Sequence, residues 1–231
     1  MLATMRFPLI HSPLVTNETW VALVMHLETS GFRATAVALE NNAAQDAWLF
    51  AHHIAQIESA LAPLADDRLI AVAHSGAGNV LALLDPSRFE AHVFLDAIFP
   101  TETASRFELF GDPAAVRSWR DTAKHHSGML SRSMLLRFGD QIDDSNFRNA
   151  FVASLVDVPV ELYEEPTPVH PNWPRVKRGF YLQWTASYAA DAARAENAGF
   201  QVHRDPASHF KMINNPDEVA EELVRLARQI E

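Results

Sequence analysis

One stretch of the sequence, residues 69–84, constrains the fold more than any other. It opens with an apolar run, residues 69–73, that is typical of a strand buried on both faces of a sheet. Small residues then surround Ser75, and an apolar run that favours a helix follows. The pattern predicts a strand, a tight turn with Ser75 at its tip, and a helix. Such a turn holds the serine hydroxyl clear of the backbone at the carboxyl edge of a sheet, with helix N–H groups pointing toward it.

The small residues around Ser75 explain how so sharp a turn can form. Side chains two positions before and after the serine collide unless they are small, and here they are Ala73 and Ala77. Gly76 and Gly78 loosen the turn further. The G-x-S-x-G pattern is therefore present with alanine at both outer positions. A glycine-rich turn between a core strand and a core helix is the alternative, because short motifs carry a false-positive risk.

Two segments carry a resemblance to a known family. Residues 73–77, with the sequence AHSGA, resemble the nucleophile elbow of the α/β-hydrolase superfamily. Residues 207–223 resemble the end of these proteins, where a catalytic histidine precedes Pro-x-x-Val and the final helix; here the histidine is His209. The chain is also similar to short actinobacterial-type members that resemble small esterases, with an H-S-P-L turn and an F-L/V-D-A-x-x-P segment. The resemblance covers essentially the whole chain.

Composition narrows the classes of function for this chain of 231 residues. Its 48% hydrophobic and 21% charged residues are typical of a globular protein, and the length suits one domain with a large core. A formal net charge of −10 argues against a nucleic-acid partner. The absence of cysteine excludes disulfides, thiolate metal sites and a cysteine nucleophile. With no apolar run of about 18 residues and no signal-peptide pattern, we expect a cytoplasmic protein without membrane association.

Strand-like and helix-like segments alternate over much of the chain. Strands are expected within residues 6–14, 32–39, 69–73, 91–96, 179–184 and 199–203, and helices at 17–30, 47–62, 77–84, 187–197 and 216–230. This alternation predicts a parallel sheet with right-handed crossovers. Because the first strand comes so early, the antiparallel pair that opens many superfamily members is missing. We therefore expect an α/β fold, with a mainly parallel six-stranded sheet flanked by helices.

The alternation stops after residue 100 and resumes near residue 176. The intervening residues 101–175 are rich in large apolar side chains, are broken by prolines and lack a clean strand–helix rhythm. We expect a core formed by residues 1–100 and 176–231, with residues 101–175 as a helical cap insertion, which the superfamily varies freely. An exposed cap is compatible with a homodimer, although no seam for one stands out in the sequence.

His209 is the candidate proton acceptor for Ser75. It follows the last expected strand by a short loop, and in a parallel sheet of this order that loop lies at the same edge as the turn at Ser75. A loop histidine without a partner is the alternative for this segment taken alone. The conjunction of the two motifs, in the expected strand order, is more specific than either one.

An acid beside His209 would hold the imidazole in one tautomer and stabilise it when protonated. The superfamily usually places this acid just after the strand that ends here at Trp184, but residues 185–188 contain no carboxylate. The resemblance offers a second position, after the preceding strand, where Asp96 stands. We therefore predict Asp96 as the acid, with a turn-capping aspartate as the alternative reading. Asp191, inside an expected helix, is the runner-up.

An oxyanion hole needs two N–H donors. The N–H of Gly76, directly after the serine, is the first candidate. The second should come from the loop after the first strand, where His11 and Ser12 resemble the superfamily's His-Gly. Pro13 follows and has no N–H, so the N–H of Leu14 or the hydroxyl of Ser12 would have to serve.

Four residues near the two motifs are expected to line a substrate: His11, Ser12, His74 and Phe99. His11 is expected to fold its loop rather than to react. The paired histidines at residues 52–53 and 125–126 lack the spacing of metal ligands, because adjacent side chains point to different faces. We expect neither a metal nor a cofactor.

Together these features predict a serine hydrolase. Ser75 would attack a carbonyl, His209 would act as base and then as acid, and Asp96 would orient the imidazole, with water releasing an acyl-enzyme. The apolar insertion suggests a small to medium, partly apolar substrate. A carboxylic ester is the first choice, and thioesters, lactones and amides stay open.

Two other classes of function stay open on the same fold. A lyase or cyclase would use the triad as acid and base without forming an acyl-enzyme. A non-catalytic protein that binds a small molecule is favoured by the missing acid after Trp184 and by Pro13. The combination of serine, histidine and elbow argues against this last class.

Overall fold

The computed structural model describes residues 5–41, 49–109 and 113–230, and a six-stranded sheet organises them. The strands are β1 (Met5–Ile10), β2 (Arg33–Val37), β3 (Arg68–His74), β4 (Ala91–Leu95), β7 (Gly179–Gln183) and β8 (Gln201–Arg204). They lie in the order β2-β1-β3-β4-β7-β8, and every neighbouring pair is parallel. The predicted six-stranded sheet is confirmed, and it is parallel throughout.

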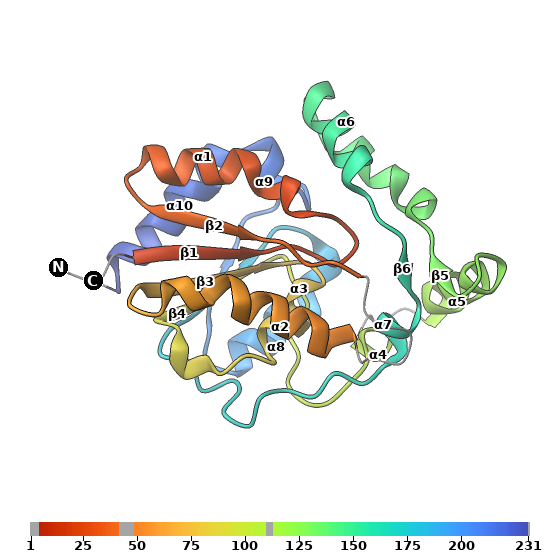
Figure 1. The fold of residues 1–231 in the computed structure, drawn as a ribbon, viewed down its shortest axis with the longest axis horizontal. Helices are drawn as coiled ribbons and strands as arrows, with labels where there is room; N and C mark the ends of the chain where they lie inside the picture. Colours follow the sequence, from red (N-terminus) through yellow and green to blue (C-terminus); the bar gives the residue numbers. More distant parts are fainter. Residues whose placement is uncertain (1–4, 42–48, 110–112, 231) are drawn as a thin grey trace.

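Helices cover both faces of this sheet (Figure 1). The helices on one face are α1 (Val21–Thr29), α9 (Lys211–Asn214) and α10 (Pro216–Arg228), and those on the other are α2 (Leu49–Leu61), α3 (Ala77–Leu81) and α8 (Ala189–Asn197). Short 3-10 turns join them: η1 (Asn17–Trp20), η2 (Ala62–Leu64), η3 (Pro86–Arg88) and η5 (Ala186–Tyr188). The helix expected at residues 47–62 is α2, and residues 47 and 48 lie outside the described residues.

Side chains of the central strand β3 explain the two layers. Ile70 and Val72 pack into the apolar cluster beneath α1 and α10, whereas Ala71 and Ala73 pack into the cluster beneath α2 and α3. Successive side chains of a strand point to opposite faces, so a strand covered on both sides must be apolar at every position. This is why residues 69–73 form a continuous apolar run.

The chain reverses its direction of travel across the sheet at β1. β2 lies on one side of β1 and β3 on the other, which leaves a crevice at the carboxyl ends of β1 and β3. Ile10 and Ala73 are paired in the sheet, so Ser12 and Ser75 each follow two residues beyond the same rung. The strand order therefore places both serines at the crevice.

Residues 101–164 form a separate group of short elements beside this edge (Figure 1). They are α4 (Arg106–Leu109), α5 (Pro113–His125), β5 (Met129–Leu130), the 3-10 segment η4 (Arg132–Gln141), α6 (Ser145–Ser154), β6 (Val158–Pro159) and α7 (Glu161–Glu164). The antiparallel pair of β5 and β6 was not expected, because two-residue strands leave no periodic pattern. The chain then returns to the core, where the Trp173 indole N–H donates to the Pro100 carbonyl oxygen over 2.7 Å.

A buried histidine lies within β4. His92 is fully buried, and neither ring nitrogen has a hydrogen-bond partner among the described residues. Its ring packs against Phe89 and Trp173, with centroid distances of 5.0 and 5.8 Å. Burial lowers the pKa of His92 from 6.5 to about 3, so the folded chain holds the ring neutral.

Acid should therefore destabilise the fold, and His92 should carry part of the effect. Below its ordinary pKa of 6.5 the unfolded chain binds a proton at His92, while the folded chain does not until about 3. Each pH unit in this window favours unfolding by roughly 1.4 kcal/mol for each such group. Urea titrations between about pH 7 and pH 4.5 should show a smaller loss of unfolding free energy in His92→Leu than in the parent.

The matched control is His26→Leu, because His26 is exposed on α1. It should leave the pH dependence of the unfolding free energy unchanged. His11 and His53, whose pKa values burial lowers to about 4 and about 3, maintain part of the slope in every variant. An identical slope in His92→Leu and the parent would contradict the prediction.

Candidate active site

Ser75 occupies the tip of the turn between β3 and α3, with φ = +56°. A serine at positive φ is strained, and such strain concentrates at functional sites. The carbonyl oxygen of Ser75 accepts the N–H of Ile98 at 3.0 Å, which ties the turn to the segment after β4. A Cβ on Gly78 would lie 1.8 Å from the carbonyl oxygen of Ile98, so this approach requires glycine. α3 ends at Leu81, earlier than the predicted helix over residues 77–84, because the N–H groups of Leu83 and Leu84 bond three residues back rather than four.

The structure brings His209 and Asp96 together near this turn. Nδ1 of His209 lies 2.7 Å from Oδ2 of Asp96, which is fully buried. The Thr185 hydroxyl also donates to Oδ2 at 2.8 Å, and the N–H groups of Trp184 and Thr185 donate to Oδ1 at 3.0 Å. A carboxylate held in this way fixes the proton of His209 on Nδ1 and leaves Nε2 as the acceptor.

The position after β7 supplies hydrogen-bond donors in place of the acid. β4 and β7 are parallel neighbours, with Leu95 paired to Leu182, so Asp96 and Thr185 leave the same edge of the sheet. The Thr185 hydroxyl therefore reaches the carboxylate that the neighbouring strand presents. This explains how a chain without a carboxylate in residues 185–188 still places one beside His209.

Asp191, the other candidate acid, has a different set of partners. It lies in α8, where Oδ1 accepts the N–H of Phe99 at 2.7 Å and also pairs with Arg194. Burial raises its pKa. Among the described residues no hydrogen bond joins it to His209. Its contacts tie α8 to the segment after β4, although its side chain also borders the cavity described below.

The imidazole of His209 packs against the rings of Tyr188 and His74, as well as that of the neighbouring Phe210. Tyr188 stacks on the imidazole with a centroid distance of 5.2 Å and an interplanar angle of 6°. His74 lies 4.4 Å away, and its Nε2–H donates to the carbonyl oxygen of His209 at 2.9 Å. Burial holds the pKa of His74 well below its ordinary value, so the ring is neutral and adds no positive charge beside His209. His74 is therefore a support for the His209 loop.

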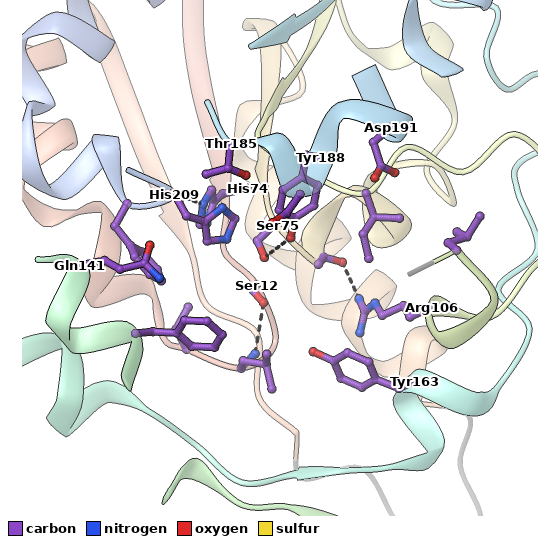
Figure 2. Close-up of a pocket in the computed structure, with 18 of the residues that line it drawn as sticks. Ser12, His74, Ser75, Arg106, Gln141, Tyr163, Thr185, Tyr188, Asp191 and His209 are labelled. Carbon is purple, nitrogen blue, oxygen red and sulfur yellow. Dashed lines mark hydrogen bonds between the residues drawn. The ribbon is translucent and has the colours of Figure 1, made fainter. Parts of the chain in front are cut away.

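The hydroxyl of Ser75 is paired with Tyr188. Its Oγ lies 3.1 Å from the Tyr188 hydroxyl (Figure 2). Within the described part of the chain no hydrogen bond joins Ser75 to His209. Nucleophile–base hydrogen bonds are often long or poorly aligned before substrate binds. Burial raises the pKa of Tyr188, so its hydroxyl stays protonated and can donate to Oγ.

The hydroxyl of Ser12 lies close to Gly76. The N–H of Leu14 donates to Ser12 Oγ at 3.5 Å, and a Cβ built on Gly76 would lie 3.3 Å from the same oxygen. The N–H of Gly76 has no acceptor among the described residues. The groups available beside Ser75 are thus the Gly76 N–H and the Ser12 hydroxyl, with the Leu14 N–H donating to the latter.

A cavity of about 310 Å³ opens above Ser75. Ser12, His74, Ser75, Gly76 and His209 line it from the sheet, and residues 101–164 contribute Leu109, Trp119, Phe138, Phe151, Leu155 and Tyr163. Most side chains from residues 101–164 are apolar or aromatic, and the exceptions are Gln141 and Arg106 (Figure 2). Arg106 is the charged residue among them. Its side chain reaches the turn at Ser75, where Nη2 donates to the carbonyl oxygen of Gly76 at 2.5 Å.

Two of the four residues expected to line a substrate lie elsewhere. Ser12 and His74 border the cavity, whereas His11 and Phe99 do not. His11 is a support for the loop after β1, because its Nδ1 lies 2.8 Å from the Ser12 carbonyl oxygen and its Nε2 accepts the N–H of Leu39. Phe99 belongs to the aromatic core, with its ring centroid 4.8 Å from that of Phe200.

Sequence reasoning missed Arg106 and Tyr188. An arginine in an irregular insertion gives no pattern that separates a buried side chain from a solvated one. Tyr188 lies in the segment after Trp184, where only a carboxylate was expected.

Among the described residues no group of three His, Asp or Glu side chains is placed to hold a metal ion. In the same ranges no helix has both the length and the apolar character needed to span a membrane.

Comparison with known proteins finds similarity in three dimensions only, since no family model and no curated protein matches the sequence. An extracellular α/β-hydrolase from a Paenibacillus species, described as sharing structural and functional homology with tobacco salicylic acid binding protein 2, has a TM-score of 0.80. It is 17% identical, and the match covers 96% of this chain and 98% of that one. This chain has the α/β-hydrolase fold.

Two further structures with the α/β-hydrolase fold match over nearly the full length. Polyneuridine aldehyde esterase has a TM-score of 0.74 at 18% identity, with 97% of this chain and 99% of that chain covered. Tomato methylketone synthase I has a TM-score of 0.71 at 14% identity, with both chains covered completely. Because the matches extend over the cap as well as the sheet, the α/β-hydrolase fold describes the whole chain.

Replacement of Gly78 by alanine should destabilise the turn that carries Ser75. The new Cβ would meet the backbone of Ile98 at 1.8 Å, so α3 or the segment after β4 must move. We expect a loss of about 1–3 kcal/mol or more in the free energy of unfolding, measured by urea titration. Gly139→Ala is the matched control, since its nearest new neighbour is a movable methyl group of Val152 at 3.0 Å. Equal losses in the two variants would contradict the argument.

Proposed function

We propose that this protein is a serine hydrolase that cleaves small to medium carboxylic esters through an acyl-enzyme. The observation that carries the proposal is the His209–Asp96 pair, with 2.7 Å between Nδ1 and Oδ2, beside a serine at φ = +56°. The apolar cavity above Ser75 supports a partly apolar substrate. The names of two similar structures, an α/β-hydrolase and an esterase, support the same class of reaction.

The reaction begins with attack of Ser75 Oγ on the ester carbonyl carbon. Nε2 of His209 takes the proton from Oγ as the new C–O bond forms, and then gives that proton to the departing alcohol oxygen. Asp96 stabilises the imidazolium that exists between these two transfers. Water then attacks the acyl-enzyme while His209 takes a proton from it as base, and His209 passes that proton to Ser75 Oγ as the acid leaves.

Charge that develops on the carbonyl oxygen needs donors already in place. The N–H of Gly76 supplies one, and the hydroxyl of Ser12 supplies the second. The N–H of Leu14 donates to Ser12 Oγ, which therefore acts as the acceptor in this pair. The hydroxyl proton of Ser12 then points away from Leu14. The protonated Tyr188 hydroxyl can donate to Ser75 Oγ, and a hydrogen bond in that direction would favour loss of the serine proton to His209.

Labelling with a fluorophosphonate, read as intact mass, tests the proposed nucleophile. We expect one adduct per chain in the parent and none in Ser75→Ala, because only an activated serine attacks the phosphorus. Ser87→Ala is the matched control: Ser87 is exposed, and its variant should label like the parent. A parent protein that is folded by circular dichroism yet takes no label would count against a serine hydrolase.

Asp96→Asn should slow ester hydrolysis strongly while labelling of Ser75 remains detectable. An asparagine amide cannot stabilise the imidazolium and favours the wrong tautomer, so kcat should fall on the order of 10³–10⁴-fold. Asp191→Asn should reduce kcat far less, because Asp191 bonds Phe99 and Arg194 rather than His209. Initial rates with a p-nitrophenyl ester measure both variants. A larger loss in Asp191→Asn would reassign the acid.

Acid–base chemistry without an acyl-enzyme is the second candidate. The hydrogen bond from Tyr188 to Ser75 favours it, because in this arrangement the serine hydroxyl is not bonded to His209. Tomato methylketone synthase I, whose name is not that of a hydrolase, is also similar in structure. Mass spectrometry of protein quenched during turnover separates the two reactions: an acyl group on Ser75 supports hydrolysis, and turnover without one supports the second candidate.

A further inference from the structure

Arg106 is a buried cation with no counter-charge among the described residues. It is the first residue of α4, its side chain is 1% exposed, and it borders the cavity above Ser75. Nη2 donates to the carbonyl oxygen of Gly76, while Nε and Nη1 have no partner among the described residues. No carboxylate in the described part of the chain forms an ion pair with it. Buried arginines are ordinarily paired, so an unpaired one beside a cavity indicates a missing anion.

Two aromatic rings lie close to the guanidinium. The Cζ atom of Arg106 lies 5.2 Å from the ring centroids of both Phe50 and Tyr163. Such contacts recover only part of the hydration that burial removes. Burial lowers the pKa of Arg106, yet a guanidinium keeps its proton in proteins. The site therefore presents a permanent positive charge with unused N–H groups.

The position of Arg106 places it on the side of Ser75 where the acyl part of a bound ester would lie. Its Cζ lies 3.6 Å from where a Cβ on Gly76 would be, so the guanidinium is close to the reacting centre. In Figure 2, His209 and Arg106 lie on opposite sides of Ser75. The alcohol leaves toward His209, which protonates it. The acyl part therefore extends toward Arg106.

We propose that Arg106 binds a carboxylate on the acyl part of the substrate, and that the preferred substrates are monoesters of short dicarboxylic acids. The substrate class rests on the hydrolysis proposed above. The planar fork of a guanidinium matches the two oxygens of a carboxylate. Of the described residues that line the cavity, Arg106 is the only arginine or lysine and Asp191 the only acid. A single positive charge matches a monoanion better than a phosphate dianion.

Two esters that differ only in this charge test the proposal: p-nitrophenyl hydrogen glutarate and its methyl ester. The parent should have a kcat/KM about tenfold or more higher for the free acid, after subtraction of the uncatalysed rate. Arg106→Met should bring the ratio to one or below, and Arg106→Lys should keep part of it. A ratio near one in the parent would overturn the inference, as would equal losses on both esters in Arg106→Met with the ratio preserved.

The matched control is Arg120→Met. Arg120 is another cap arginine that lies over a ring, with Cζ 5.1 Å from the centroid of Phe107, but it is paired with Glu164 outside the cavity. Its variant should keep the parental ratio of the two esters. Circular dichroism establishes that each variant is folded, and Arg106→Lys supplies the test if Arg106→Met does not fold.

Binding without turnover separates this inference from the proposed hydrolysis. Ser75→Ala protein should bind glutarate in calorimetry, and the added change Arg106→Met should weaken that binding about tenfold or more, whereas Arg120→Met should not. Glutarate binding that depends on Arg106, in a protein that fluorophosphonate does not label, would retain the anion site and reject the hydrolase. Labelling without such binding would do the reverse. Inorganic phosphate that binds more tightly than glutarate would overturn the assignment of a carboxylate.

Discussion

Parallel pairing of three adjacent strands is the constraint on which the site depends. His74 at the end of β3 is paired with Leu95 at the end of β4, and Leu95 is paired with Leu182 in β7. The residues that follow these rungs therefore leave the sheet together, at the edge where open parallel sheets bind ligands. Ser75 and Asp96 both adopt positive φ at this point, with values of +56° and +42°. The backbone turns sharply at both positions, and the hydrogen bonds around the turns hold them in place.

Asp96 and Arg106 are both buried at the site, but their hydrogen-bond partners differ. Asp96 is surrounded by donors, since Trp184, Thr185 and His209 together occupy both of its oxygens. Arg106 borders the cavity, and its Nε and Nη1 have no partner among the described residues. A buried charge with every lone pair satisfied supports structure or catalysis from within the protein. This difference supports the proposed roles of Asp96 as a positioning group and Arg106 as a binding group.

Most of the core could be predicted from local patterns. A continuous apolar run predicted β3 because strands covered on both faces carry mostly apolar residues. Shorter apolar stretches predicted β1 and β4. The elbow at Ser75 was predictable because a sharp turn tolerates only small neighbours. Residues 101–164 were harder to predict, since their short helices leave only weak periodic patterns, and the pair of β5 and β6 left no signal. The lining of the cavity was only partly predictable, as His11 and Phe99 turned away from it.

The sequence alone determined where a turn with an exposed serine can form, because steric rules act between residues that are close along the chain. It also limited the partners of that serine to a few candidates. Which acid meets His209 was decided by tertiary structure, because the register of β4 against β7 places Asp96 beside Thr185. The same holds for Tyr188 and Arg106, whose contacts with Ser75 and Gly76 join residues 113 and 30 positions apart. Local patterns carry no information about such distant neighbours, since only the packed chain brings them within hydrogen-bond distance.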